Sequence, residues 1–136
     1  MSMTVVMLEP GKKARIVEME KDLESMQKVV GGLIQAIYPF EDEVALICND
    51  EGKMIGLPAN RGLCDSDGRL YDILCGTCFI CGAPFTTGDF QSLSEEQIKK
   101  YYEMFEFPET FCKVDGEIVS VKFNFCLDEE EKDEER

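Results

Sequence analysis

The sequence predicts a single α+β domain, built on a mixed or largely antiparallel sheet of about six strands with two helices packed on it. The first reason is size, because 136 residues, of which 44% are apolar, suffice for one domain with a buried core. The second reason is pattern, because strand-like runs and two helical segments follow one another without regular alternation. The sequence shows no internal repeat and no sign of a second core. We therefore expect one domain over residues 1–127.

The first part of the chain predicts three strands and the first helix. Residues 4–8 and 14–19 are strand-like apolar runs separated by a Pro–Gly turn. Residues 22–30 predict a short amphipathic helix, because apolar residues recur there at helical spacing and a pair of glycines follows. No serine or threonine is placed to cap the start of this helix. Residues 33–38 predict the next strand, which Pro39 ends.

The middle of the chain is rich in turn signals. We expect a hairpin over residues 43–57 with its turn at Asn49–Gly52. Pro58–Gly62 would then leave the sheet as a loop, and Asp65–Gly68 would form a second turn. A long apolar stretch, interrupted by Gly76 and followed by Gly82, runs from Leu70 to Cys81.

The second helix has the clearest start signal in the chain. Ser94 and Gln97 form a capping box, and Leu93 and Ile98 occupy the two positions of a hydrophobic staple. The helix is expected to end at Phe107–Pro108, because proline cannot continue it.

A hairpin around Asp115–Gly116 is predicted after the second helix. Its second strand alternates between apolar and polar residues, so one face should point inward and the other outward. The inward residues would be Val119, Val121, Phe123, Phe125 and Leu127, with Ser120, Lys122 and Asn124 outward. Residues 128–136 hold seven acidic and two basic residues, a composition typical of a disordered acidic tail.

Five short stretches, taken in order, resemble a known family. They are Val29–Ile34, Asn49–Lys53, Leu57–Asn60, Ile73–Thr77 and Phe90–Ile98. Over roughly residues 4–110 the chain resembles an uncharacterised family of small proteins from phages and conjugative elements of gut Firmicutes, a domain of unknown function. The resemblance implies no activity. It implies an accessory gene of a mobile element, of a kind often found near antirestriction genes.

Composition excludes several classes of function. The chain has no histidine, so it has no histidine triad, histidine metal ligand or imidazole base. Its formal net charge of −14 disfavours binding to nucleic-acid phosphates. The sequence contains no apolar run of about 18 residues that would predict a membrane span. The N-terminus does not resemble a signal peptide, so we expect a cytoplasmic protein. We also expect no cofactor, no nucleic-acid partner and no membrane partner.

Cys75, Cys78 and Cys81 form the sharpest local motif. Thiolates at this spacing can wrap a zinc ion or begin an iron–sulfur site. A fourth zinc ligand would have to come from Cys64, Cys112 or Cys126. In a strand, however, Cys78 would face away from the other two, and the three could not share an ion. We expect core cysteines and no metal, and no neighbouring base activates a cysteine nucleophile.

The loop expected at Pro58–Gly62 carries two candidates for ligand binding, Asn60 and Arg61. An amide and a guanidinium after a buried strand could hold an anionic or planar ligand such as a nucleotide. The alternative is that Arg61 is a salt-bridge partner. Asp65–Gly68 resembles the start of a calcium loop, but Gly76 stands where the last position of such a loop needs a glutamate, so a plain turn is expected.

Acidic side chains are the remaining candidate for function. Dense carboxylates can imitate a phosphate backbone and occupy the basic groove of another protein, although acidic surfaces also serve solubility. The candidates on the second helix are Glu95, Glu96 and Glu103. We therefore expect a non-enzymatic protein that binds a host protein through acidic side chains. The alternative is a small-ligand binding protein that uses the Pro58–Arg61 loop, and the sequence leaves the oligomeric state open.

Overall fold

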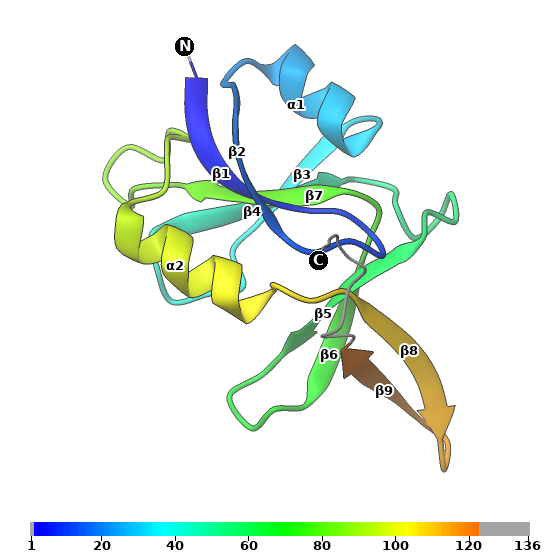
Figure 1. Ribbon diagram of the computed structural model, residues 1–136. Coiled ribbons are helices and arrows are strands. Elements are labelled where there is room, and N and C mark those ends of the chain that lie inside the picture. Colours follow the sequence, from blue (N-terminus) through cyan, green and yellow to red (C-terminus); the bar gives the residue numbers. More distant parts are fainter. Residues whose placement is uncertain (1, 123–136) are drawn as a thin grey trace, which may run out of the picture.

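The computed structural model describes residues 2–122, which form nine strands and two helices (Figure 1). All strand pairs among them are antiparallel, so the predicted α+β class is confirmed. In chain order the elements are β1 (Ser2–Leu8), β2 (Arg15–Glu20), α1 (Leu23–Val30), β3 (Ile34–Ile37), β4 (Val44–Asn49), β5 (Ala59–Cys64), β6 (Leu70–Cys75), β7 (Cys78–Gly82), α2 (Glu95–Met104), β8 (Glu109–Val114) and β9 (Glu117–Lys122).

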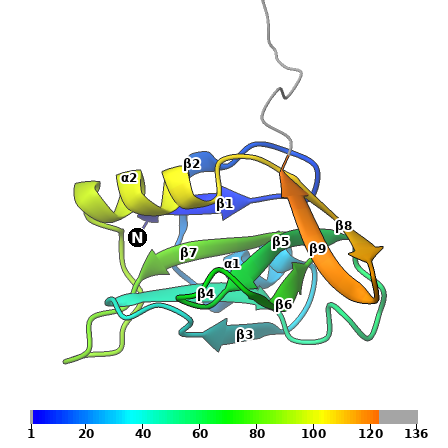
Figure 2. The same ribbon diagram turned by 90° about the horizontal axis from the view of Figure 1, so that it is seen from below.

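Five of these strands form the central sheet, in the order β2-β1-β7-β4-β3 (Figure 2). Its side chains alternate between two faces, as in any strand. One face carries a buried cluster that includes Val6, Leu46 and, from α2, Tyr101. The other face carries a cluster that includes Met7 and, from α1, Val30. The two helices therefore cover opposite faces of the sheet.

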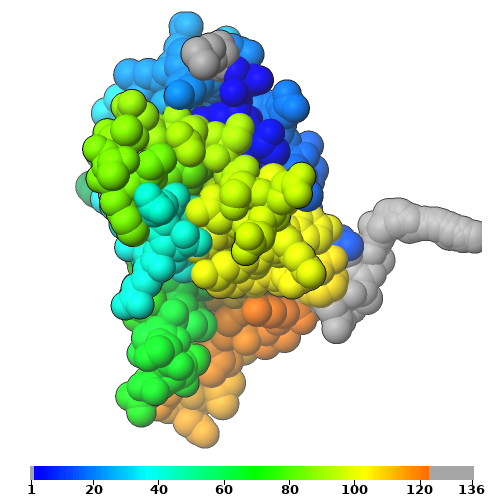
Figure 3. Space-filling view, turned by 90° about the vertical axis from the view of Figure 1, so that its left-hand side faces the viewer, coloured from blue at the N-terminus to red at the C-terminus, as the bar shows by residue number. Residues whose placement is uncertain are grey.

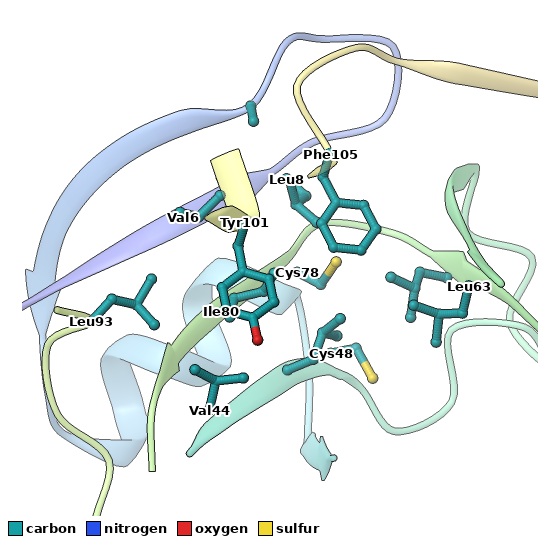
Figure 4. Packing of buried hydrophobic residues seen from close by; sticks show 13 residues of the cluster. Val6, Leu8, Val44, Cys48, Leu63, Cys78, Ile80, Leu93, Tyr101 and Phe105 are labelled. Carbon is teal, nitrogen blue, oxygen red and sulfur yellow. The ribbon is translucent and has the colours of Figure 1, made fainter. Parts of the chain in front are cut away.

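The cluster beneath α2 also joins the β5–β6 hairpin to the sheet. Figure 4 shows Tyr101 of α2 near Val6 and Ile80 of the sheet, and Phe105, the residue after the helix, beside Leu8. Leu63 of β5 lies at the far end of the same cluster. Because one continuous core holds both parts together, the β5–β6 hairpin has a fixed position relative to the sheet.

The helix starts follow the sequence closely. The predicted capping box is present, with Gln97 N–H donating to Ser94 Oγ at 3.1 Å and Ser94 N–H donating to Gln97 Oε1 at 2.9 Å. The start of α1 is capped as well, by Asp22, whose carboxylate accepts from Ser25 N–H at 3.0 Å. Among the described residues, neither the eight residues of α1 nor the ten of α2 make a helix long and apolar enough to cross a membrane.

The hairpin predicted over residues 43–57 is wrong. β4 pairs with β3 and β7, and residues 51–56 form turns instead of a returning strand. The turn region packs closely against β6, because a Cβ at Gly52 would lie 2.7 Å from the Cys75 carbonyl oxygen. Tertiary packing therefore determines the conformation of this segment, although its local sequence pattern is typical of a strand.

The loop predicted at Pro58–Gly62 is also wrong, because β5 begins at Ala59 and pairs with β6. The apolar stretch from Leu70 to Cys81 divides at Gly76, which has φ of +84°. Its first part is β6 of the hairpin and its second part is β7 of the central sheet. A single apolar run thus serves two different sheets.

The β8–β9 hairpin turns at Asp115 and Gly116, both with positive φ, as a two-residue turn of this kind requires. Its predicted orientation is wrong. Val119 and Val121 are 36% and 44% exposed, whereas Ser120 is half-buried and faces β5. The predicted inward residues Phe123, Phe125 and Leu127, the outward Asn124 and the acidic segment 128–136 lie outside the described residues.

Candidate functional site

A groove of about 900 Å³ lies between the β5–β6 and β8–β9 hairpins. We call it the hairpin groove. Figure 3 shows the face on which its components meet: the segment after β3 in cyan, the β5–β6 hairpin in green, α2 in yellow and the β8–β9 hairpin in orange. Its apolar lining residues include Phe40, Leu70, Tyr71, Met104, Phe105 and Ile118.

A buried carboxylate lies in the lining of this groove. Glu109, at the start of β8, is only 9% exposed. Its Oε1 accepts hydrogen bonds from Gly62 N–H at 3.0 Å and from the Ser120 hydroxyl at 2.5 Å. Within residues 2–122 no donor reaches its second oxygen, Oε2. A carboxylate accepts several hydrogen bonds, so Glu109 retains capacity for a donor from outside the chain.

The close approach of Glu109 to β5 depends on a glycine. A Cβ at Gly62 would lie 3.3 Å from Glu109 Oε1 and 3.2 Å from Phe111 Cε1, and it would also collide with Leu70. The absence of a side chain therefore lets the carboxylate reach the main chain of β5.

Charged side chains of both signs also line the groove. Arg69, Glu117 and Lys122 are exposed, whereas Glu109 is buried. Lys122 is the cross-strand partner of Glu109 in the β8–β9 register, yet no ion pair within 4.0 Å forms between them in the described structure. The buried carboxylate is therefore the charged group of the lining with the least access to water.

Asn60 and Arg61 lie in β5 and are fully buried. The Arg61 guanidinium donates to the Phe105 carbonyl at 3.0 Å, to the Lys12 carbonyl at 2.6 Å and to Asn60 Oδ1 at 2.8 Å. Asn60 Nδ2 donates to the carbonyls of Leu8 and Gly76, at 2.9 and 2.8 Å. Arg61 thus connects β5 to the β1–β2 turn and to the end of α2, and Asn60 connects it to β1 and to the turn before β7. Neither side chain reaches the surface where a ligand would approach.

A second polar contact holds α2 against the segment that follows β3. Tyr101 hydroxyl donates to Asp42 Oδ2 at 2.8 Å, and Gln97 Nε2 donates to Asp42 Oδ1 at 3.2 Å. Burial raises the pKa of Asp42, but these hydrogen bonds, the Glu43 N–H and the nearby Lys100 outweigh it and leave that pKa below its ordinary value. Burial and the Asp42 carboxylate raise the pKa of Tyr101.

The cysteines predicted as a possible metal knuckle are separated in space. Cys78 and Cys81 belong to the clusters on opposite faces of the central sheet, so they cannot share an ion, and Cys75 lies on β6. Burial raises the pKa of Cys78 and raises the pKa of Cys81 to about 12, which disfavours the thiolate that binds metal. Residues 2–122 contain no group of three Cys, Asp or Glu placed to hold a metal ion.

The other candidate ligands do not gather either. Cys64 and Cys112 are exposed on different hairpins, and Cys126 lies outside the described residues. Asp65 forms the plain turn that the sequence predicts, with its Oδ1 accepting from Asp67 N–H and Arg69 N–H at 2.9 Å each. No calcium-type loop therefore forms at this position.

The acidic candidates on α2 stand on a mixed surface. Glu95, Glu96 and Glu103 are exposed, as an interaction surface requires, but Lys99 and Lys100 lie between them and are exposed too. Glutamate and lysine four residues apart are neighbours on a helix surface. The helix therefore presents alternating charge rather than a continuous acidic stripe.

Comparison with known proteins places the chain in a family. A domain described as DUF3846, a domain of unknown function, matches residues 3–106. The chain belongs to this family. The match confirms a domain of unknown function over most of the span that the sequence motifs indicated. No curated protein and no solved structure matches the chain.

The end of the DUF3846 match bears on the groove. The match stops at residue 106, directly after α2, so the whole β8–β9 hairpin lies beyond it. The wall formed by β5, β6 and α2 belongs to the DUF3846 domain, whereas the opposite wall and Glu109 belong to the appended hairpin. The hairpin groove is therefore assembled from the DUF3846 domain and a segment beyond its matched region.

Sequence reasoning missed both Glu109 and Gly62. Glu109 directly follows a proline in a strongly acidic chain, where one more glutamate does not stand out. A signal was present in the alternation of β8, because Glu109 has the same strand parity as the half-buried Phe111. Gly62 was assigned to a loop, where glycine is unremarkable.

Proposed function

We propose that this DUF3846 protein is a non-enzymatic binding protein that takes a basic segment of a partner protein into the hairpin groove. The observation that carries the proposal is Glu109, a carboxylate that is buried in the groove lining and has one oxygen without a donor among the described residues. A buried carboxylate is stabilised by a cationic or N–H donor, and a lysine or arginine side chain of a partner would supply it.

The apolar walls favour a protein segment over a small polar ligand. Tyr71, Met104 and Ile118 line the groove and remain 56%, 39% and 49% exposed. Grouped exposed apolar side chains mark protein-binding surfaces, and tyrosine is among the residues that contribute most to the binding energy there. A lysine or arginine flanked by apolar residues fits both features.

The charge of the whole chain supports a basic partner. A formal net charge of −14 attracts basic proteins and accelerates their association. The resemblance to proteins of phages and conjugative elements supports a host protein as that partner, with this chain as an accessory protein. The acidic residues of α2 would act in this scheme as steering charges near the groove, since Met104 and Phe105 at the end of that helix line it.

The test is a selection of random peptides of roughly ten residues on the immobilised chain, followed by titration of the enriched peptides. We expect enrichment of lysine or arginine beside apolar residues. Glu109→Gln keeps the size and the accepting oxygen but removes the charge, and should weaken these peptides about 10- to 100-fold.

Glu117→Gln is the matched control, because Glu117 lines the same groove but is exposed. It should weaken the peptides less than about threefold. A selection without a shared basic motif, or equal affinities for the wild type and Glu109→Gln, would refute the proposal.

A further inference from the structure

The two edge strands of the central sheet differ in character. β2 carries the exposed charges Arg15, Glu18 and Glu20, which is how proteins commonly protect an edge from further strands. β3, the other edge in Figure 2, lies in a stretch without any charged residue, 29–40. A chain with 31% charged residues therefore leaves one edge of its sheet uncharged.

The main chain of β3 is available for pairing on its outer side. Asp50 N–H donates to the Leu33 carbonyl at 2.9 Å, which fixes the phase of the β3–β4 ladder. Because hydrogen-bonded pairs alternate along an antiparallel ladder, the N–H and C=O groups of Ile34 and Ala36 point away from β4. Within the described residues no strand lies on that side and no hydrogen bond reaches these groups.

The side chains of β3 leave both core layers incomplete. Ile34 and Ala36 pack against the cluster on the α1 face, and Ile37 packs against the cluster on the α2 face. All three stay half-buried, whereas every residue of β4, one strand further in, is buried. One more strand beside β3 would cover both layers.

Acidic residues stand at both ends of this edge. Glu41 is exposed beyond the end of β3, and Asp50 and Glu51 are exposed beside its start. A second copy of the chain pairing antiparallel through β3 would bring Glu41 of one copy towards Asp50 and Glu51 of the other, which like charges oppose. A strand with basic ends would meet opposite charge at both.

We infer that β3 is a strand-addition edge whose occupant is an extended segment of a partner protein, with an uncharged β-forming centre and lysine or arginine at its ends. The main chain would supply affinity through Ile34 and Ala36, and the acidic ends would select the partner. This edge is separate from the hairpin groove, which other elements form, so each can be tested with the other as control.

The probe is a ten-residue synthetic peptide of alternating valine and threonine between lysine pairs, with a glutamate-ended peptide of the same core as control. Amide hydrogen exchange, residue by residue, is the readout that is specific to strand addition. We expect the lysine-ended peptide to slow exchange at Ile34 and Ala36 at least tenfold and to leave the β2 amides unchanged.

The matched variant is Ala36→Pro. It removes an N–H that points away from β4, so the β3–β4 ladder stays intact while strand addition is blocked. We expect it to abolish the protection of the Ile34 amide by the lysine-ended peptide, and we expect Glu109→Gln to leave the protection of Ile34 and Ala36 unchanged. Absence of binding, binding without protection of Ile34 and Ala36, or protection that arises from self-association of the chain alone would overturn the inference. Because exchange is also measured on the wild type, the test does not depend on the variant folding.

Discussion

Two regions of the molecule differ in how their buried charge is hydrogen-bonded. One is the core that joins the central sheet to β5, and the other is the contact between β5 and the β8–β9 hairpin. In the first, Arg61 is fully buried and its guanidinium donates to four main-chain carbonyls and to the side chain of Asn60. In the second, Glu109 is buried with one oxygen engaged and the other without a donor in the described residues. Buried charge that is matched within the chain stabilises the fold, whereas buried charge left partly unmatched is available to a partner.

The largest effect we expect comes from removing the matched charge. Arg61→Ala leaves the carbonyls of Phe105 and Lys12 without a donor inside the protein and also opens a cavity. A buried acceptor that loses its donor costs about 1–3 kcal/mol and the cavity adds to this cost, so the free energy of unfolding in urea should fall by about 3–5 kcal/mol.

Arg69→Ala is the control, because Arg69 is exposed and lines the groove. Its free energy of unfolding should stay within about 0.5 kcal/mol of the wild type. If Arg61→Ala were as stable as Arg69→Ala, the hydrogen bonds of the Arg61 guanidinium would not stabilise the fold as we describe. The candidate role of Arg61 in binding a ligand would then gain support.

A smaller loss is expected at the contact between α2 and the segment after β3. Tyr101→Phe removes the hydrogen bond to Asp42, and a hydrogen bond to a charged group contributes about 1.5–3 kcal/mol. Because Asp42 keeps Gln97 and the Glu43 N–H, we expect the lower end of that range at about pH 7.

The same variant has a predictable dependence on pH. The ordinary pKa of Asp42 is 3.8, and folding lowers it. The ionised carboxylate therefore stabilises the fold above pH 3.8. This stability is lost as the pH falls through the lowered pKa of the folded protein. The difference between wild type and Tyr101→Phe should therefore be full at about pH 7 and shrink below about pH 3.8. Tyr102→Phe, whose hydroxyl makes no hydrogen bond in the described residues, should show no such dependence. A difference that persists unchanged in acid would contradict the role of Asp42.

Local signals were sufficient wherever one segment determined its own structure. The capping box at Ser94 and Gln97 and the turn at Asp115–Gly116 were predictable because both motifs are complete within a few residues. The apolar run of residues 4–8 likewise predicted a strand, and β1 spans Ser2–Leu8.

The parts of the fold that could not be predicted from the sequence depend on contacts between segments far apart in the chain. Asn60 and Arg61 are polar residues of the kind found in loops, yet they form the middle of β5 because carbonyls from distant segments accept their hydrogen bonds. Valines 119 and 121 were expected inward for their apolarity, but Ser120 faces β5 because Glu109 accepts from it. The hairpin groove is formed by segments separated by tens of residues, and no local pattern in the chain indicates it.

The smallest effect we expect concerns the surface of α2. Replacing Glu95, Glu96 and Glu103 with lysine should slow association of a basic groove peptide about two- to tenfold at low salt and leave its dissociation rate nearly unchanged, because exposed charges act mainly on encounter. The difference should disappear at high salt, as measured by stopped-flow kinetics. The reversal of Glu18, Glu20 and Glu24, which are exposed on β2 and α1, changes the net charge equally and is the matched control. Equal slowing by both sets would assign steering to the overall charge, and no slowing by the α2 set would refute that surface as part of the site.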